Sequence, residues 1–441
     1  MTDFAPAGVP IDAGVPTDTG VSNDAGVSTD GASPIKVIAI GFNSPGTGLT
    51  RVMHSVMRRL AAHLEVHYLG IGYKGEVEHD RGLAIHPTNP HGGDVFAAFQ
   101  AQRMIEEIQP SVLFIMHDIW LFDFYLRHLA QYRDRLKIVC YIPLDGAIVN
   151  PTDAAALSQA DCVVSYTRFA CGQFEEAFRR LRESQTVDTT PPVRVIPHGV
   201  ARDRFHPFPE LISAGFASPG RARAKAHVFG ERVDPRDSFI VLNASRPDIR
   251  KRIDLTIEGF AKFAAGKPDN VRLCLHHAIM DAEWERRVRQ SIEQCGIGER
   301  VILNPLGSRI VDDEELNWLY NACDVGINTS MGEGWGLVSF EHGAAGAAQI
   351  VPDHTACGEL WRGRAELIPP ARFFVPSYSV LEVGEVPPDG VAHALDRLYT
   401  DPAHRAALGK AAADAALDPA FSWDTIARQF ADLFNSLARR D

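Results

Sequence analysis

The sequence predicts an α/β protein with two doubly wound parallel sheets, and two observations predict this fold class. Short apolar runs alternate with segments long enough for a helix, first over residues 35–200 and again over residues 239–360. Such alternation is typical of parallel strands joined by crossover helices. The chain has 441 residues, which accommodates two domains of ordinary size, each with a hydrophobic core of its own.

Apolar runs in the first half of the chain are typical of buried parallel strands. They cover residues 36–41, 66–70, 111–116, 136–142, 162–165 and 193–196. Because ligands of doubly wound sheets bind at the carboxyl ends of the strands, polar residues that follow these runs are site candidates. They are His117, Asp145, Arg168 and His198. Structural explanations stay open as well, since a histidine can cap a strand or hold a loop and Asp145-Gly146 can form a turn.

A glycine-containing loop follows the first of these runs. It contains Gly46, Thr47 and Gly48, and a helical pattern then runs over residues 49–63. The spacing of its glycines differs from the Gly-x-Gly-x-x-Gly fingerprint of dinucleotide-binding proteins. The sequence therefore disfavours a dehydrogenase.

The second half opens with the apolar run Phe239–Asn243, and a cluster of positive charge follows it. The four cations are Arg246, Arg250, Lys251 and Arg252. We expect Arg250 and Arg252 to lie on a solvated face. A helical pattern over residues 253–263 and further strand patterns at 271–275 and 301–303 come next.

The stretch around which the second half is organised covers residues 323–349. An apolar run at 325–328 ends in a loop with glycines at 332, 334 and 336, and a helical pattern follows. Glycines allow sharp turns and close approach of a ligand, and the first N–H groups of a helix attract phosphate. Glu333 and Glu341 flank this helix start, and each carboxylate can accept hydrogen bonds from neighbouring sugar hydroxyls. The pattern therefore fits a nucleotide-sugar, although two solvated glutamates are the simpler alternative.

The motif Glu-Gly-Trp-Gly-Leu with a second glutamate after seven residues resembles the signature of retaining glycosyltransferases of family 4, the glycosyl transferases group 1. The resemblance covers roughly residues 35–438. It departs from the family at Asp145, near which many relatives carry a histidine, and at Ala348, where a proline is usual. The resemblance implies the GT-B fold, in which two Rossmann-like domains face each other across a cleft and a last helix returns to the first domain.

The resemblance also implies roles for individual residues. Glu333 contacts the donor sugar and Glu341 the ribose, while Arg246 and Lys251 match the family's Arg-x4-Lys pair for the diphosphate. Asp145 takes the place of the missing histidine as a catalytic candidate. The remaining donor-side candidates are Gly46, Thr47, Gly48, Arg309, Ile310, Gly334, Trp335, Gly336 and Leu337. The acceptor-side candidates are Arg51, His117, Arg168 and His198.

The expected chemistry needs no metal or other cofactor. Fixed cations stabilise a departing diphosphate, and the sequence lacks the Asp-x-Asp motif with which other sugar transferases hold a divalent ion. We expect a UDP- or GDP-linked sugar as donor and a glycan, lipid-linked glycan, small molecule or protein as hydroxyl acceptor. A nucleotide-sugar epimerase, a phosphorylase of the same architecture and a non-catalytic sugar-nucleotide-binding subunit remain alternatives.

Composition narrows the partners and the compartment. A formal net charge of −12 argues against a nucleic-acid-binding protein. The sequence contains no run of eighteen uncharged apolar residues, so it predicts no transmembrane segment. Peripheral contact with a membrane is still allowed. Seven scattered cysteines suggest neither a disulfide framework nor a zinc site. We therefore expect a cytoplasmic protein.

The expected domain boundaries follow changes in composition. Residues 1–33 carry a repeated six-residue pattern rich in Gly, Pro, Ser and Asp, which favours a disordered tail over a short β-solenoid. Residues 34–205 form the acceptor-side Rossmann-like domain, and residues 206–236 form a connection with a surface helix. Residues 237–418 form the nucleotide-sugar-binding Rossmann-like domain, and residues 419–441 form the helix that crosses back.

Overall fold

The computed structural model describes residues 35–89, 92–209, 218–277 and 280–439. The expected tail over residues 1–33 lies outside the described residues. The same holds for residues 210–217, which fall in the expected connection between the domains.

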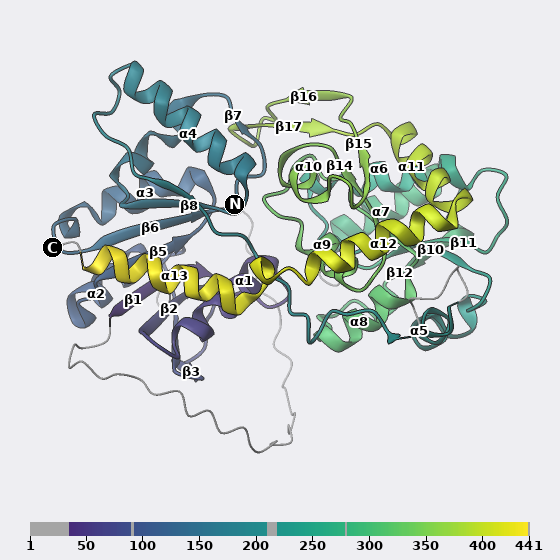
Figure 1. Cartoon of the computed structure of the whole chain (residues 1–441), viewed down its shortest axis with the longest axis horizontal. Helices are drawn as coiled ribbons and strands as arrows, with labels where there is room; N and C mark the ends of the chain where they lie inside the picture. Colours follow the sequence, from purple (N-terminus) through teal and green to yellow (C-terminus); the bar gives the residue numbers. More distant parts are fainter. Residues whose placement is uncertain (1–34, 90–91, 210–217, 278–279, 440–441) are drawn as a thin grey trace. The chain divides into compact units, whose positions relative to one another are not determined.

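The first half of the described chain forms an eight-stranded sheet in the order β3-β4-β2-β1-β5-β6-β8-β9 (Figure 1). Its strands are β1 (Lys36–Phe42), β2 (Glu65–Ile71), β3 (Glu78–Asp80), β4 (Leu83–Pro87), β5 (Val112–Met116), β6 (Lys137–Ile142), β8 (Cys162–Ser165) and β9 (Val193–Val195). Its helices are α1 (Gly48–Leu60), α2 (Ala98–Ile108), α3 (Phe122–His128) and α4 (Arg168–Glu183). All neighbouring strands are parallel except β3 and β4. The six predicted strands are confirmed, whereas β3 and β4 were not predicted, and the polar edge strand β3 carried no apolar signal.

The second half forms a six-stranded parallel sheet among the described residues, in the order β12-β11-β10-β13-β14-β15. Its strands are β10 (Phe239–Asn243), β11 (Val271–Leu275), β12 (Val301–Leu303), β13 (Val325–Ile327), β14 (Ala348–Pro352) and β15 (Glu366–Ile368). The helices of this half are α5 (Pro219–Phe229), α6 (Ile253–Ala264), α7 (Ala282–Gln294), α8 (Asp313–Ala322), α9 (Leu337–Ala344), α10 (Thr355–Trp361), α11 (Pro388–Thr400) and α12 (Pro402–Ala416).

In both sheets, the strands that follow the first strand are added first on one side of it and later on the other. In the second sheet β10 has β11 on one side and β13 on the other, and in the first sheet β1 has β2 on one side and β5 on the other. This is the strand order of doubly wound nucleotide-binding folds, in which the ligand occupies the crevice at the switch point. The central strands are buried on both faces, as the apolar run Val37–Ile40 illustrates.

A small antiparallel sheet joins segments from the two halves. Strand β7 (Ala147–Ile148), which follows β6, pairs with β17 (Leu381–Glu385), and β17 pairs with β16 (Arg372–Phe374). None of these three strands was predicted. Their pairing places the segment after β6 against the second half, close to the site described below.

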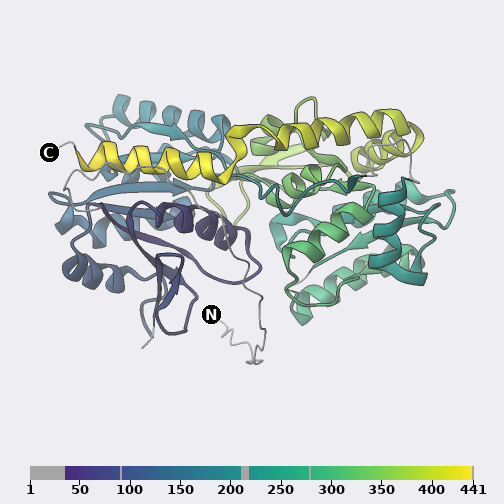
Figure 2. The same cartoon turned by 60° about the horizontal axis from the view of Figure 1, so that its bottom comes forward.

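The last helix, α13 (Trp423–Ala438), packs on the first sheet, as Figures 1 and 2 show beside α1 and β5. The ring of Phe430 lies 5.3 Å from Phe114 of β5 and 5.0 Å from Tyr141 of β6. The apolar face of the last helix therefore packs on the first sheet, and the predicted return of this helix is confirmed.

The helix expected within residues 206–236 is α5, and part of its surface is buried. Helix α5 packs against α8, and Lys225 is fully buried, with its Nζ 2.9 Å from Asp324 Oδ2. The same carboxylate oxygen accepts a hydrogen bond of 2.8 Å from the backbone N–H of Ile240. A buried carboxylate needs such partners, so Lys225 serves the interior and does not mark a solvated face.

Among the residues that the structure describes, no helix has both the length and the apolar character that crossing a membrane requires.

Candidate functional site

Two loops meet at the switch point of the second sheet. One follows β10 and the other follows β13, and these strands are neighbours. The backbone N–H of Met331 donates to the carbonyl of Arg250 over 2.8 Å, and the hydroxyl of Thr329 donates to the carbonyl of Lys251 over 3.2 Å. The parallel sheet therefore brings the cationic segment and the Glu333 loop together.

Two glycines of the Glu333 loop are required by its backbone. A Cβ at position 332 would lie 1.7 Å from the carbonyl oxygen of Asp145, which no side chain can tolerate. Gly336 has φ of 87°, a left-handed conformation that favours glycine, and it directly precedes α9. The sequence thus allows the segment after β6 to approach the loop and lets α9 begin at Leu337.

Glu333 lies at the centre of a cluster of donors and is only 6% exposed. Its Oε1 accepts from Lys251 Nζ at 2.6 Å, from Asn328 Nδ2 at 3.0 Å and from Ser330 Oγ at 2.8 Å. Arg250 lies 3.5 Å from Oε2. Although burial raises the pKa of Glu333, Lys251 and Arg250 outweigh this effect and lower the pKa to about 2. Glu333 is therefore a fixed anion whose Oε2 has fewer hydrogen-bond donors than Oε1.

Arg250 does not lie on a solvated face, so that expectation is wrong. Its Nε lies 3.1 Å from Asp145 Oδ2, and its guanidinium also donates to the carbonyl of Gly332. The physical reason is that the segment after β6 approaches the loop closely and brings the carboxylate of Asp145 to Arg250. Asp145 thereby joins the Glu333 cluster through Arg250.

The expectation of a solvated face is also wrong for Arg252. Its guanidinium pairs with Glu385 of β17 and, at 2.8 Å, with Asp254 of α6. This pairing connects the cationic segment to the small antiparallel sheet.

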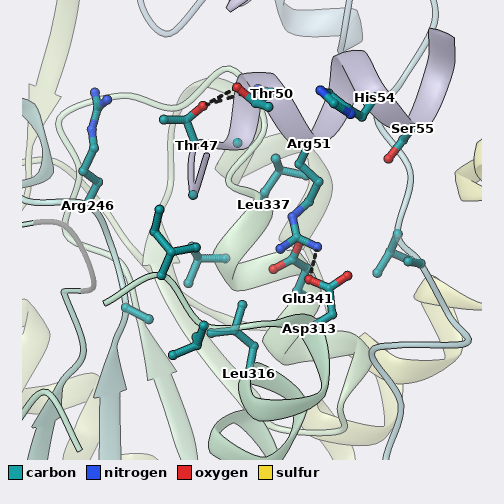
Figure 3. A pocket seen from close by; sticks show the side chains of 18 of the residues that line it. Thr47, Thr50, Arg51, His54, Ser55, Arg246, Asp313, Leu316, Leu337 and Glu341 are labelled. Atoms are coloured by element: carbon teal, nitrogen blue, oxygen red, sulfur yellow. Dashed lines mark hydrogen bonds and ion pairs between the residues drawn. The ribbon is translucent and has the colours of Figure 1, made fainter. Parts of the chain in front are cut away.

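A cavity of about 390 Å³ lies beside this cluster, between the loop after β1, helix α1, the loop after β10 and helices α8 and α9 (Figure 3). Eight of the predicted site residues line it, namely Gly46, Thr47, Gly48, Arg51, Arg246, Ile310, Leu337 and Glu341. A Cβ at Gly48 would lie 2.9 Å from Leu337 Cδ1. The loop after β1 thus closely approaches the start of α9.

Glu341 and Arg51 form the charged centre of the cavity. Arg51 Nε lies 3.3 Å from Glu341 Oε1, and Arg51 NH1 lies 2.7 Å from Asp313 Oδ1. The hydroxyl of Tyr320 donates to Glu341 Oε2 over 3.1 Å. Burial raises the pKa of Glu341, and Arg51 opposes that effect. Arg51 was predicted on the acceptor side, but its guanidinium contacts the carboxylate that was expected to bind the ribose.

Arg246 is an exposed cation of the cavity. Its side chain is 58% exposed, and its ion pair with Asp248 has a long separation of 3.5 Å. Figure 3 shows Arg246 well apart from the group formed by Arg51, Glu341 and Asp313. Positive charge is therefore available to a ligand at this end of the cavity.

Several predicted site residues do not line the cavity. Arg309 is ion-paired with Glu315 near the surface, although its neighbour Ile310 does line the cavity. Trp335 is buried, with its ring 5.4 Å from that of His198. Gly334 and Gly336 shape the loop, and Lys251, Glu333 and Asp145 form the neighbouring cluster.

The other predicted acceptor-side residues do not line the cavity. His117 is buried against Phe42 and Trp120, with ring separations of 4.9 and 5.6 Å, and burial lowers its pKa to about 4. His198 is buried with its ring 3.8 Å from that of Tyr166. Arg168 begins α4, where its backbone N–H donates to Glu359 Oε1 over 3.0 Å. A structural explanation therefore suffices for Arg168, whereas His117 Nε2 and both ring nitrogens of His198 are buried without a hydrogen-bond partner among the described residues.

Sequence reasoning missed five residues of the two clusters: Arg250, Asp313, Tyr320, Asn328 and Ser330. A signal existed for Asp313, because Asp312 already caps α8 and forms a capping box with Glu315, which leaves the second aspartate free for another role. No pattern in the sequence marked Tyr320, because its side chain reaches Glu341 only through the packing of α8 against α9.

The described residues contain no group of three or more His, Cys, Asp or Glu side chains arranged to hold a metal ion. His276 lines the cavity, while His277 shares a hydrogen bond of 2.6 Å between its Nδ1 and the carbonyl of Ser245. The two adjacent histidines thus have different surroundings.

Residues 228–415 match the family model described as "Glycosyl transferases group 1". A search of curated protein sequences finds no match. The matched region contains β10 to β15, Glu341 and the residues of the Glu333 cluster other than Asp145, so the match falls on the second sheet.

Solved structures similar to this chain include sucrose-phosphate synthase from Thermosynechococcus elongatus, with 18% identity and a TM-score of 0.69 over 91% of this chain and 99% of that chain. HepE from Anabaena, in complex with UDP and glucose, has 15% identity and a TM-score of 0.64 over 91% and 100%. An α,α-trehalose-phosphate synthase (UDP-forming) from Burkholderia xenovorans, in complex with glucose-6-phosphate, has 12% identity and a TM-score of 0.65 over 91% and 100%. The likeness establishes a GT-B fold with two Rossmann-like domains.

Proposed function

We propose that this protein, a glycosyltransferase by its group 1 domain and its GT-B fold, moves a sugar from a nucleoside-diphosphate sugar to a hydroxyl acceptor with retention of configuration and without a metal ion. The observation that carries the proposal is the single cavity in which the loop after β1, Arg246, the start of α9 and Glu341 come together. A diphosphate needs cations and N–H groups, and a ribose needs a carboxylate. The cavity wall offers all of these groups.

In the proposed complex Glu341 accepts hydrogen bonds from the ribose hydroxyls, and Ile310 lies beside the base. The diphosphate lies between Arg246 and the first N–H groups of α9. Glu333 accepts hydrogen bonds from the donor sugar through its less heavily used Oε2. Lys251, which holds Glu333 Oε1 at 2.6 Å, supplies positive charge to the same region.

The proposed chemistry follows from where charge develops. When the bond between the sugar's anomeric carbon and the phosphate oxygen breaks, the diphosphate gains negative charge. Arg246, Lys251 and the N-terminus of α9 stabilise that charge, because cations and dipoles that already face the diphosphate need little reorganisation. The acceptor oxygen bonds to the anomeric carbon on the face that the phosphate oxygen leaves, and the departing oxygen takes the acceptor's proton, so the configuration is retained.

The identity of the nucleotide is part of the proposal. UDP- and GDP-linked sugars are the first donors to test, and the solved structure of HepE with UDP and glucose supports UDP-glucose as the first probe. The trehalose-phosphate synthase structure with glucose-6-phosphate supports a sugar phosphate among the acceptors. Glycans, lipid-linked glycans, other small molecules and proteins complete the acceptor panel, so peripheral membrane contact remains part of the proposal.

The proposal also covers the compartment. All seven cysteines are unpaired, which supports a reducing compartment and hence the cytoplasm.

The test is a transfer assay with UDP- and GDP-sugars and an acceptor panel, with the anomeric configuration of the product read by NMR. We expect acceptor-dependent release of nucleoside diphosphate, a product with the donor's configuration and the same rate in EDTA. Loss of activity in EDTA that is restored by Mn²⁺ or Mg²⁺ contradicts metal independence. Conversion of the donor sugar without any acceptor favours an epimerase, and transfer to inorganic phosphate favours a phosphorylase. Nucleotide binding without turnover on any acceptor favours a binding subunit.

A further inference from the structure

Arg51 connects the two sheets at the nucleotide end of the cavity. Arg51 lies on helix α1, which packs on the first sheet. Its two carboxylate partners, Glu341 and Asp313, lie on α9 and α8 of the second half. Figure 3 shows the guanidinium extending from α1 toward both carboxylates. The side chain of Glu341 is only 6% exposed. A buried carboxylate without a partner is costly, and Arg51 is the cation that provides one.

The contacts of Glu341 leave it able to bind a ligand. Its Oε1 receives Arg51 at 3.3 Å and its Oε2 receives the Tyr320 hydroxyl at 3.1 Å. An ionised carboxylate offers about four acceptor positions, so about two remain for a pair of neighbouring hydroxyls. Arg51 and a ribose can therefore use the same carboxylate at once, provided that Glu341 is ionised.

The surroundings of Glu341 make Arg51 decisive for that ionisation. Burial raises the pKa of Glu341 and Asp313 raises it further, whereas Arg51 and the hydrogen bond from Tyr320 lower it. The charged groups of the neighbouring helix α12 have other partners, since Arg405 donates to the carbonyl of Leu398 and Lys410 pairs with Asp414. Arg51 is thus the cation that opposes both burial and Asp313.

We propose that Arg51 is a positioning residue of the donor site, which holds Glu341 as an oriented anion so that this carboxylate can accept hydrogen bonds from both hydroxyls of the nucleotide's ribose. This inference deepens the proposed function and rests on it. It moves Arg51 from the acceptor side to the donor side. It also makes the nucleotide subsite of the group 1 domain incomplete without α1, which lies outside the matched residues 228–415.

The test measures how strongly binding depends on the ribose hydroxyl, with the full-length protein. Dissociation constants of UDP, GDP and their 2′-deoxy forms are determined by calorimetry for wild type, Arg51→Met and Arg51→Lys, between pH 6 and 8.5. The ratio of deoxy to ribo dissociation constants cancels effects on phosphate ionisation and on the base. Arg59→Met serves as the matched control, because Arg59 lies on the same helix and pairs with Asp424 at 2.5 Å.

We expect a ratio of about 10 or more in wild type, since a hydrogen bond to a charged group contributes on the order of a tenfold affinity difference. In Arg51→Met the ratio falls below that of wild type and rises as pH increases, because Glu341 has lost the cation that lowers its pKa. Arg51→Lys gives an intermediate ratio, and Arg59→Met retains the wild-type ratio. The pH dependence of the ratio separates this role from a structural one.

An unchanged ratio in Arg51→Met overturns the inference and leaves the proposed function intact. Tighter ribonucleotide binding in Arg51→Met also overturns it, because Arg51 would then compete with the ribose. If Arg51→Met does not fold, a wild-type ratio in Arg51→Lys that stays constant with pH overturns the inference in the same way. Wild-type protein that binds neither nucleotide refutes the proposed function, and the inference falls with it.

Discussion

The surroundings of Glu333 and Glu341 differ, although only seven residues separate them in one loop and helix. Glu333 is held by Lys251, Asn328 and Ser330, all from the loops after β10 and β13 of one sheet. Glu341 pairs with Arg51, which comes from a helix on the other sheet. The carboxylate proposed for the sugar is therefore assembled within one half of the chain, and the carboxylate proposed for the ribose depends on a contact between the halves.

This difference has an electrostatic consequence. Both carboxylates are buried, which raises the pKa of each, but two cations at Glu333 bring its pKa down to about 2, whereas at Glu341 the pKa stays raised above 4.5. Glu333 is a permanent anion at any physiological pH. Glu341 is the carboxylate whose charge depends on its neighbours. Substitutions of the two glutamates should therefore change different kinetic parameters.

The largest effect is expected from Glu333→Gln. The substitution keeps the shape but removes the anion that holds Lys251 and, in our proposal, the donor sugar, so kcat should fall on the order of 10²- to 10³-fold. Steady-state kinetics with the preferred donor measures this change, and circular dichroism checks the fold. Ser330→Ala, which removes one of the hydrogen bonds to Oε1, is the milder companion variant and should retain most activity. Near-normal turnover of Glu333→Gln would remove Glu333 from the sugar site.

A smaller effect, on a different parameter, is expected from Glu341→Gln. Loss of the charged acceptor should raise the donor KM roughly 10- to 100-fold, because hydrogen bonds to charged groups contribute about 1.5–3 kcal/mol. The kcat should change little, since the ribose lies away from the reacting bond. If kcat falls while the donor KM stays constant, the distinction drawn between the two glutamates is wrong.

Asp145→Asn tests whether the first half contributes to the Glu333 cluster. The ion pair of Asp145 with Arg250, at 3.1 Å, is partly exposed, and such pairs contribute up to about 1 kcal/mol. We expect kcat to fall roughly 3- to 10-fold as Arg250 loses its anchor. Asp123→Asn removes an exposed pair with Arg127 on α3 and should leave the kinetics unchanged. Equal kinetics of the two variants would show that Asp145 has no part in turnover.

The smallest effect concerns pH. Because burial raises the pKa of Glu341, acidification protonates it before Glu333, and the protonated carboxyl accepts fewer hydrogen bonds from the ribose. The donor KM should therefore rise about two- to threefold between pH 7.5 and 5.5. A nucleotide-sugar has no phosphate that titrates in this interval, and Glu341→Gln provides the reference whose KM should not follow pH. A parallel rise in both proteins would assign the pH dependence to another group.

Much of the fold could be predicted from the sequence. The apolar runs at Val37–Ile40 and Phe239–Asn243 are strands, and each is buried as a parallel strand requires. Helix α13 lies within the predicted residues 419–441, because an amphipathic pattern is local. The edge strands β3 and β16 were missed because their residues are exposed and carry no apolar alternation.

The candidate site also contains residues that could be predicted from the sequence and residues that could not. Glu333, Glu341, Arg246 and Lys251 could be chosen from motifs, since their spacing is set by loops that follow strands of one sheet. Arg250 was misjudged, because the carboxylate of Asp145 that pairs with it lies more than a hundred positions earlier in the chain.

The sequence by itself determined the strand and helix pattern, the glycines that shape the Glu333 loop and the four charged residues proposed to bind a nucleotide-sugar. Only the tertiary structure decided which charges meet: Arg51 with Glu341 and Asp313, and Asp145 with Arg250. Periodicity and turn chemistry act over a few residues, and therefore leave a signal in the sequence. An ion pair between distant segments arises from how helices and sheets pack, so neither partner carries a local mark of the other.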